Sequence, residues 1–253
     1  MRNKRFLASF LSAAMVLGTV SAPAFAAEGE PQTPGVTETA VTNLGTVIET
    51  TNEGGEINLA EGETVVLPEQ IEKSVSIIGA TDAEGNPAST VVFDYTGAKD
   101  NTAFTMIVGD NITLKNINFI VKKSEVNTDH NAKKRFFWQT TGENFTLENC
   151  RFTATGTNAV ALCLCNSAVI KDCDFVGGFK QIGDGEIKGD VLIENCSFSQ
   201  TTYGIHFGTV NGYTVTVRNC DLNGTWNSFG KGSGDGMVVI ERSRFNAVNG
   251  GFN

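Results

Sequence analysis

Proline, tryptophan, tyrosine and charge are all scarce in this 253-residue chain. It has 5 prolines, 2 tryptophans, 3 tyrosines and 2 histidines, and 19% of its residues are charged, against about 25% in an average globular protein. A collagen-like rod needs far more proline, and a disordered chain or a coiled coil needs more charge. These three classes are therefore excluded, whereas the length alone allows one large all-β domain or two ordinary domains.

The charge balance is acidic. The chain has 19 Lys+Arg and 28 Asp+Glu, a formal net charge of −9. Residues 1–26 contain three basic and no acidic residues, so their removal leaves 16 minus 28, or −12. Such a surface repels polyanions on average, so we expect no nucleic-acid partner. An acidic polysaccharide would need a local basic patch or bridging calcium.

The first 26 residues have the three-part layout of a secretory signal peptide. A basic start (Arg2, Lys4, Arg5) precedes a mostly apolar run, Phe6–Val20, and Ala24-Phe25-Ala26 is a small-x-small cleavage site. We therefore expect a secreted or cell-surface protein with no membrane span after cleavage, an uncleaved anchor being the alternative. Residues 27–47 read as a flexible linker and residues 48–253 as the folded domain.

An eight-residue pattern repeats through the rest of the chain. Each copy alternates apolar and polar residues, as a half-buried β-strand does. Copies begin at Ile112 (ITLKNINF), Phe145 (FTLENCRF), Ala168 (AVIKDCDF), Val191 (VLIENCSF), Val215 (VTVRNCDL) and Val238 (VVIERSRF). The starts are 33, 23, 23, 24 and 23 residues apart, which marks a solenoid. About 23 residues fit three short strands and three bends, so we predict an all-β parallel β-helix of roughly 23-residue coils.

Charges alternate in sign at the fourth position of the pattern. They are Lys115, Glu148, Lys171, Glu194, Arg218 and Glu241. If coils stack ~4.8 Å apart, each charge faces its opposite on the neighbouring coil, which contributes ~0.2–1 kcal/mol per pair. We expect these side chains to lie outside and to set the register of the coils.

Two further columns are predicted to point inward. The sixth position carries four of the six cysteines, and the eighth carries phenylalanine in five of six copies. Cysteine packs as a small hydrophobe, so we favour buried free thiols. Disulfides are the alternative for an exported protein. Cys163 and Cys165 also read as interior. No metal site is predicted, because the cysteines come without a CxxC or a histidine companion.

The segment Glu56–Tyr95, which contains LPEQIEKSVSIIG, and the NCxF repeats resemble right-handed parallel β-helix proteins of the pectate-lyase-like superfamily (pectin lyase fold). The resemblance covers about residues 56–253 and implies the right-handed fold. It implies no single activity, because this superfamily includes lyases, hydrolases, esterases, phage tailspikes and adhesins.

The catalytic sets of the related enzyme families are incomplete here. Of the polygalacturonase-like set, only Asn127-Thr128-Asp129 is present, and the pectin-methylesterase-like motifs are missing. Asp172 and Asp174 come closest to a calcium-binding aspartate cluster, but the repeat explains both. Asp184 and Glu186 could hold calcium on a glycine-rich turn, with a solvated turn as the competing interpretation. We therefore expect no cofactor, with calcium left open.

One edge of the solenoid is the best candidate for a ligand-binding surface. Counting from the fifth residue of each copy places Arg135 and Phe137 outward, Phe136 and Trp138 inward, and His206 in an outward column with Val160, Gly183 and Gly230. The insertion that lengthens the first period carries His130 and the basic run before Arg135. Aromatic rings stack on sugar faces and cations pair with carboxylates. The competing interpretation is that the aromatic residues are packing residues. The candidate residues are Lys133, Lys134, Arg135, Phe137, Lys180, Tyr203, His206 and Trp226.

Three functions are compatible with this sequence. We favour a secreted or cell-surface module, non-catalytic, that binds glycans or displays an adhesive face. The alternatives are a polysaccharide lyase or glycoside hydrolase acting on an acidic polysaccharide, and a structural stalk of a larger surface protein. The last copy stops partway round a coil without a polar cap. We therefore expect a C-terminal continuation or a capping partner.

Overall fold

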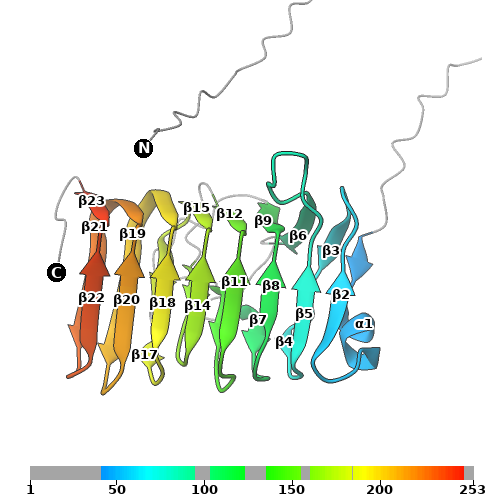
Figure 1. The fold of residues 1–253 in the computed structure, drawn as a ribbon, viewed down its shortest axis with the longest axis horizontal. Coiled ribbons are helices and arrows are strands. Elements are labelled where there is room, and N and C mark those ends of the chain that lie inside the picture. Colours follow the sequence, from blue (N-terminus) through cyan, green and yellow to red (C-terminus); the bar gives the residue numbers. More distant parts are fainter. Residues whose placement is uncertain (1–40, 95–102, 123–134, 155–159, 184, 248–253) are drawn as a thin grey trace, which may run out of the picture. The chain divides into compact units, whose positions relative to one another are not determined.

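Stacked three-strand coils form the structure of this chain, a computed structural model (Figure 1). It describes residues 41–94, 103–122, 135–154, 160–183 and 185–247. All of these belong to one compact unit, residues 40–253. Every strand pair between coils is parallel, in about 7 coils with a spacing of about 23 residues, so the predicted parallel β-helix is confirmed.

The strands predicted from the repeat form one face of the solenoid. Within the described residues this is an eight-stranded parallel sheet, whose strands stand side by side in Figure 1. In spatial order it contains β2 (Gly55–Asn58), β5 (Val75–Ile78), β8 (Thr113–Lys115), β11 (Phe145–Glu148), β14 (Ala168–Lys171), β18 (Val191–Glu194), β20 (Thr214–Arg218) and β22 (Met237–Glu241).

The other two strands of each coil belong to a 15-stranded sheet that bends around the solenoid. The strands that follow the corner are β1 (Thr42–Asn43), β3 (Thr64–Val66), β6 (Ser89–Asp94), β9 (Ile117–Lys122), β12 (Arg151–Ala154), β15 (Asp174–Gly177) and β23 (Arg244–Ala247). The third strands are β4 (Gln70–Ile71), β7 (Ala103–Ile107), β10 (Arg135–Gln139), β13 (Val160–Cys163), β16 (Lys180–Gly183) and the short β17 (Glu186–Ile187). Two long strands, β19 (Ser197–Val210) and β21 (Asp221–Ser233), run through both parts and join them.

A left-handed residue makes the corner between the first and second strand of the coils. The fifth position of all six repeat copies has φ between 46° and 57°, at Asn116, Asn149, Asp172, Asn195, Asn219 and Arg242. Asparagine and aspartate tolerate this conformation best among residues with a side chain. Their side chains also bond from coil to coil. The Nδ2 of Asn195 donates to Asp172 Oδ1 at 2.9 Å, and that of Asn219 donates to Asn195 Oδ1 at 3.1 Å.

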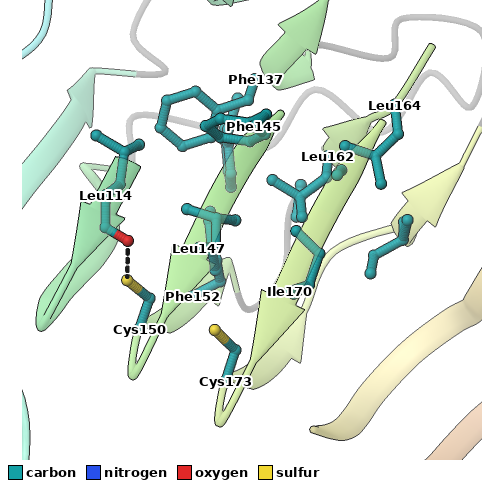
Figure 2. Packing of buried hydrophobic residues seen from close by; sticks show 14 of the residues in the cluster. Leu114, Phe137, Phe145, Leu147, Cys150, Phe152, Leu162, Leu164, Ile170 and Cys173 are labelled. Carbon is teal, nitrogen blue, oxygen red and sulfur yellow. Dashed lines mark hydrogen bonds between the residues drawn. The ribbon is translucent and has the colours of Figure 1, made fainter. Parts of the chain in front are cut away.

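Inside the solenoid the predicted aromatic and cysteine columns are confirmed. The rings of Phe119, Phe152, Phe175 and Phe198 stack with centroids 4.5, 4.9 and 4.9 Å apart. The column cysteines Cys150, Cys173, Cys196 and Cys220 are buried free thiols, and Cys150 Sγ contacts Leu114 O at 3.5 Å (Figure 2). Burial raises the pKa of the Cys173 and Cys196 thiols well above the usual thiol value. These sulfurs therefore act as apolar packing groups.

The alternating charges lie on the outer side, in register between neighbouring coils. Lys115 pairs with Glu148 at 2.8 Å, and Arg218 pairs with Glu194 at 2.7 Å. The hydrogen bond from Arg218 lowers the pKa of the Glu194 carboxyl. Lys171 lies between Glu148 and Glu194 in the sheet. The charge pattern therefore favours one register of stacking, as expected.

A strand and the start of a short helix lie upstream of residue 48, the predicted start of the folded domain. Thr42–Asn43 pair with Val65–Val66, and Leu44 is 2% exposed. The short helix α1 (Gly45–Thr50) covers the first coil, and Lys73 Nζ binds its last turn through Glu49 O at 2.9 Å. Sequence periodicity missed these elements because they occur once. Among the described residues, no helix has the length and apolarity needed to cross a membrane.

Replacing Asn195 should separate the two ways in which a corner residue stabilises the fold, its tolerance of the left-handed conformation and its hydrogen bonds to neighbouring coils. We expect Asn195→Ala to lower the free energy of unfolding by about 1–2 kcal/mol, because alanine is strained at φ 55° and the bonds to the neighbouring coils are lost. Asn195→Gly should cost less, since glycine adopts this φ freely. Urea unfolding of both variants measures the difference.

A substitution at another corner residue, Arg242, should raise the stability instead of lowering it and serves as a control. Arg242→Asn places a tolerant residue at φ 46° and should stabilise the protein by up to about 1 kcal/mol. Equal stability of wild type and all three variants would contradict the importance of the left-handed corner.

Candidate ligand-binding face

The outer side of the third strands carries the candidate site. Strand register aligns Arg135, Val160, Lys180 and Tyr203 in one row across β10, β13, β16 and β19. A second row lies three positions later along these strands. In it Trp138 of β10 is in register with Cys163 of β13, and Gly183 of β16 with His206 of β19. We call Arg135, Trp138, Lys180, Tyr203 and His206 the cationic–aromatic face.

A bend in each third strand explains this spacing. Two successive residues of β10, Phe136 and Phe137, are both buried in the core, so strict alternation is broken between Arg135 and Trp138. The same holds in β16, where Ile182 is fully buried while a Cβ on Gly183 would meet the Lys180 side chain at 2.7 Å. Outward residues are thus three positions apart instead of two.

Lys180, Tyr203 and His206 form a contact group. Lys180 Nζ lies 3.4 Å from His206 Nδ1 and 5.6 Å from the centre of the Tyr203 ring. The Tyr203 and His206 rings are 5.6 Å apart at an interplanar angle of 63°. An ammonium group can only donate, so a charged Lys180 would have His206 Nδ1 as its acceptor. Lys180 is 5% exposed, whereas the two rings are half-buried, so the rings are the accessible part.

Glycine makes room for the His206 imidazole. His206 is in register with Gly183 and Gly230, and a Cβ on Gly230 would lie 2.6 Å from His206 Cδ2. The ring therefore lies across the backbone of the next coil, where any side chain would displace it.

Arg135 and Trp138 extend the face by two coils. The Arg135 guanidinium lies 4.8 Å from the centre of the Trp138 ring, in cation–π geometry. Arg135 Nε is buried and has no hydrogen-bond partner among the described residues. The indole face is thus one of the groups that hold this cation.

The structure corrects three orientations expected from the sequence. Phe137 was expected to face outward, but it is 1% exposed and packs among core residues such as Phe145 (Figure 2). Trp138 was expected inside and is half-buried on the outer side. Cys165, also expected inside, is partly exposed. Lys180, Tyr203 and His206 do come together as one group.

Fixed counting failed because a coil can keep its period while its strands shift. Leu162 is in register with both Phe137 and Ile182. It follows Asn149 by 13 residues, whereas Ile182 follows Asp172 by 10. The segment between the corner and β13 is thus three residues longer than the one before β16, and the segment after β13 is shorter by the same number. Val160 therefore pairs with Lys180, and not with Gly183 as expected from counting.

Several predicted residues lie outside the described part of the chain. These are Lys133, Lys134, His130, Asn127-Thr128-Asp129 and Asp184, and the side chain of Trp226 in β21. Their proposed roles remain predictions. The residues after Ala247, which carry the expected open end of the last coil, also lie outside it.

The described carboxylates of the calcium hypothesis have partners in the protein. Asp172 accepts a hydrogen bond from Asn195, and Asp174 Oδ1 accepts one from Ser197 Oγ at 2.5 Å. Glu186 lies 3.4 Å from Lys188 Nζ. Among the described residues, no group of three or more His, Cys, Asp or Glu side chains could hold a metal ion. The arrangement of these carboxylates thus fits structural roles.

A double-mutant cycle should measure how closely the His206 ring packs against Gly230. We expect Gly230→Ala to cost about 1–3 kcal/mol of stability, because the new methyl group overlaps the imidazole. In a His206→Ala background the same change should cost much less. Urea unfolding of the four proteins gives the coupling. Equal costs in both backgrounds would show that the ring does not lie across Gly230.

Comparison with known proteins concerns the fold. Residues 135–253 match the family model of the right handed beta helix region, and no curated protein sequence matches the chain significantly. Among solved structures, pectin methylesterase from Aspergillus niger in deglycosylated form is 12% identical, with 82% of this chain and 83% of that chain covered and a TM-score of 0.48.

Two further structures are similar. The same Aspergillus niger enzyme in penultimately deglycosylated form is 13% identical, covering 85% and 88% of the two chains with a TM-score of 0.45. The enzymatically active domain of bacteriophage CBA120 tailspike protein 2 is 12% identical, covering 79% of this chain and 39% of that chain with a TM-score of 0.39. The family match covers residues 135–253 and is to right-handed β-helix regions, the hand that the resemblance in the sequence implies.

Proposed function

We propose that this chain is a secreted β-helix module that binds an acidic glycan, without catalysis, through the cationic–aromatic face. The observation that carries the proposal is the contact group of Lys180, Tyr203 and His206, with Arg135 and Trp138 on nearby coils. Secretion rests on the signal-peptide layout of residues 1–26.

The chemistry of the face suits a charged sugar chain. Half-buried Tyr203 and Trp138 offer aromatic surface to the apolar C–H faces of pyranose rings. The cations at Arg135 and Lys180 favour carboxylated or sulfated sugars over neutral ones. Coils are spaced ~4.8 Å apart, so Arg135, Lys180 and Tyr203, which lie in one row, are presented at intervals of one or two coils along a bound chain. The acidic remainder of the surface would confine a polyanion to this face.

Absence of catalysis is proposed from the sequence. The motif sets of the polygalacturonase-like and pectin-methylesterase-like families are incomplete or missing, as shown above.

Replacing Tyr203 should weaken binding selectively. We expect the protein to be retarded in affinity gels that contain polygalacturonate, alginate or a sulfated glycan, and not in gels with neutral dextran. Tyr203→Ala should lower the affinity about tenfold, the loss of one stacking partner. Tyr213→Ala is the matched control, because Tyr213 is 42% exposed and lies before β20, away from the face. Binding should also weaken with salt.

Two outcomes would contradict this function. Equal effects of the two tyrosine substitutions would place the ligand elsewhere. Failure of the folded protein to bind any glycan of the panel would favour a structural stalk.

One observation favours a polysaccharide lyase as the second candidate. Lys180 Nζ, His206 Nδ1 and the Tyr203 ring are in mutual contact, and proton-transfer groups within hydrogen-bond reach are what β-elimination from a uronate needs. The two candidates differ in their product. Binding alone predicts no unsaturated uronate in an ultraviolet absorbance assay, with or without calcium. Product that forms with wild type and is lost in Tyr203→Phe would overturn the non-catalytic proposal.

A further inference from the structure

Two cysteines beside the cationic–aromatic face differ from those of the core column. Cys163 ends strand β13 and Cys165 follows two residues later, so their side chains extend to the same side of the chain. Leu162 and Leu164, which alternate with them along the chain, are both buried in the core, so the two cysteines lie on the opposite side. Cys163 is 2% exposed, whereas Cys165 is partly exposed. We propose that Cys163 and Cys165 form a redox-active dithiol, in which Cys165 attacks small disulfides and Cys163 resolves the product.

The backbone around Cys165 is held by one buried amide. Gln139 is 1% exposed, and its Oε1 accepts hydrogen bonds from the backbone N–H of Cys165 at 3.2 Å and of Asn166 at 2.9 Å. Its Nε2 donates to Gly142 O at 2.7 Å and Ser167 O at 2.9 Å. A buried side chain with all these bonds made fixes the position of the attacking sulfur.

Gly185 allows a second segment to approach the same sulfur. A Cβ at this position would lie 1.6 Å from Leu164 O and 3.3 Å from Cys165 Sγ. Only glycine permits this approach, which brings the backbone N–H of Glu186 within hydrogen-bond reach of Cys165 Sγ. The indole N–H of Trp138 reaches the sulfur from the neighbouring coil. The Cys163 thiol, the Trp138 indole and the Glu186 N–H therefore all lower the pKa of this one thiol.

These donors stabilise the thiolate of Cys165. The hydrogen bond from Cys163 is the largest contribution and, with Trp138, Glu186 N–H and the Lys188 cation, lowers the pKa of Cys165 to about 6. Burial acts in the opposite direction. The same thiol–thiol bond and burial raise the pKa of Cys163. Arg135 acts on Cys163 as a further charged group, and the Lys188 cation itself pairs with the Glu186 carboxylate at 3.4 Å.

The reaction balances with a small disulfide as the oxidant. The Cys165 thiolate attacks one sulfur of RSSR, the S–S bond of the reagent breaks and RS⁻ leaves. Loss of the thiolate charge removes the partner that held the Cys163 proton, and the proton passes to RS⁻. Cys163 sulfur then attacks Cys165 Sγ and the second RS⁻ leaves. The dithiol is oxidised to a disulfide and RSSR is reduced to two RSH, the second RS⁻ taking from solvent the proton that Cys165 released when it ionised.

The four column cysteines supply an internal control. They are buried, and their sulfurs contact backbone carbonyls, as Cys173 Sγ does with Lys171 O at 3.0 Å. A carbonyl oxygen stabilises the thiol and not the thiolate, so these residues should remain unreactive until the protein unfolds.

Alkylation of the reduced native chain tests the first half of the proposal. We expect iodoacetamide to label Cys165 before any column cysteine, with a rate that rises with pH around a midpoint near 6. Trp138→Phe removes one donor to the thiolate and should move this midpoint upward. A wild-type midpoint near ~8.5, the value of an ordinary thiol, or labelling no faster than in the column would overturn the proposal.

Oxidised glutathione tests the second half. Mass spectrometry of the wild type should find the segment with Cys163 and Cys165 lighter by two hydrogens, without bound glutathione. Cys163→Ser should stop at a mixed disulfide on Cys165, and Cys165→Ser should not react. Persistent glutathione on wild-type Cys165 would refute the resolving role of Cys163. The wild-type experiments decide the question even where a variant fails to fold.

Discussion

The coils of the six repeat copies turn the same corner at the same place, because each strand is hydrogen-bonded only to the coils on either side of it. The left-handed residue after the first strand makes that corner, and it recurs at Asn116, Asn149, Asp172, Asn195, Asn219 and Arg242. Its conformation is unfavourable for most residues, so the sequence repeats asparagine there. The inward cysteine and phenylalanine columns follow at fixed distances from this corner, and their positions depend on it.

The sequence predicts best those residues whose distance from that corner is the same in every repeat copy. The first strand, the corner and the second strand share one spacing in all six copies, so their register, buried columns and outer charges were predicted correctly. The third strand follows a segment of variable length. Val160 therefore lies in the row of Lys180, and Cys163 lies three residues later, where counting had placed Val160. The single helix of the described residues, α1, has no repeat to reveal it.

The candidate site lies in the part of the coil that the repeat does not constrain. Lys180, Tyr203 and His206 were grouped correctly because β16 and β19 follow their corners at equal distances. Phe137 lies inside and Trp138 outside, opposite to the expectation, because two successive residues of β10 point inward. No residue type in β10 indicates this bend. The partly exposed position of Cys165 depends on Gly185 and Gln139, which approach it only in the folded chain. Variable loops and non-periodic contacts thus carry the chemistry here.

The alternating charges have a consequence for how such a solenoid can change its length. Glu148, Lys171 and Glu194 occupy consecutive coils. Excising the coil with Lys171 would place Glu148 against Glu194, and like charges on adjacent strands destabilise. Excising two consecutive coils would instead bring Glu148 against Arg218 and preserve the alternation. The ladder therefore gives the solenoid a parity, under which gain or loss of coils in pairs is compatible with the outer charges and a single event is not.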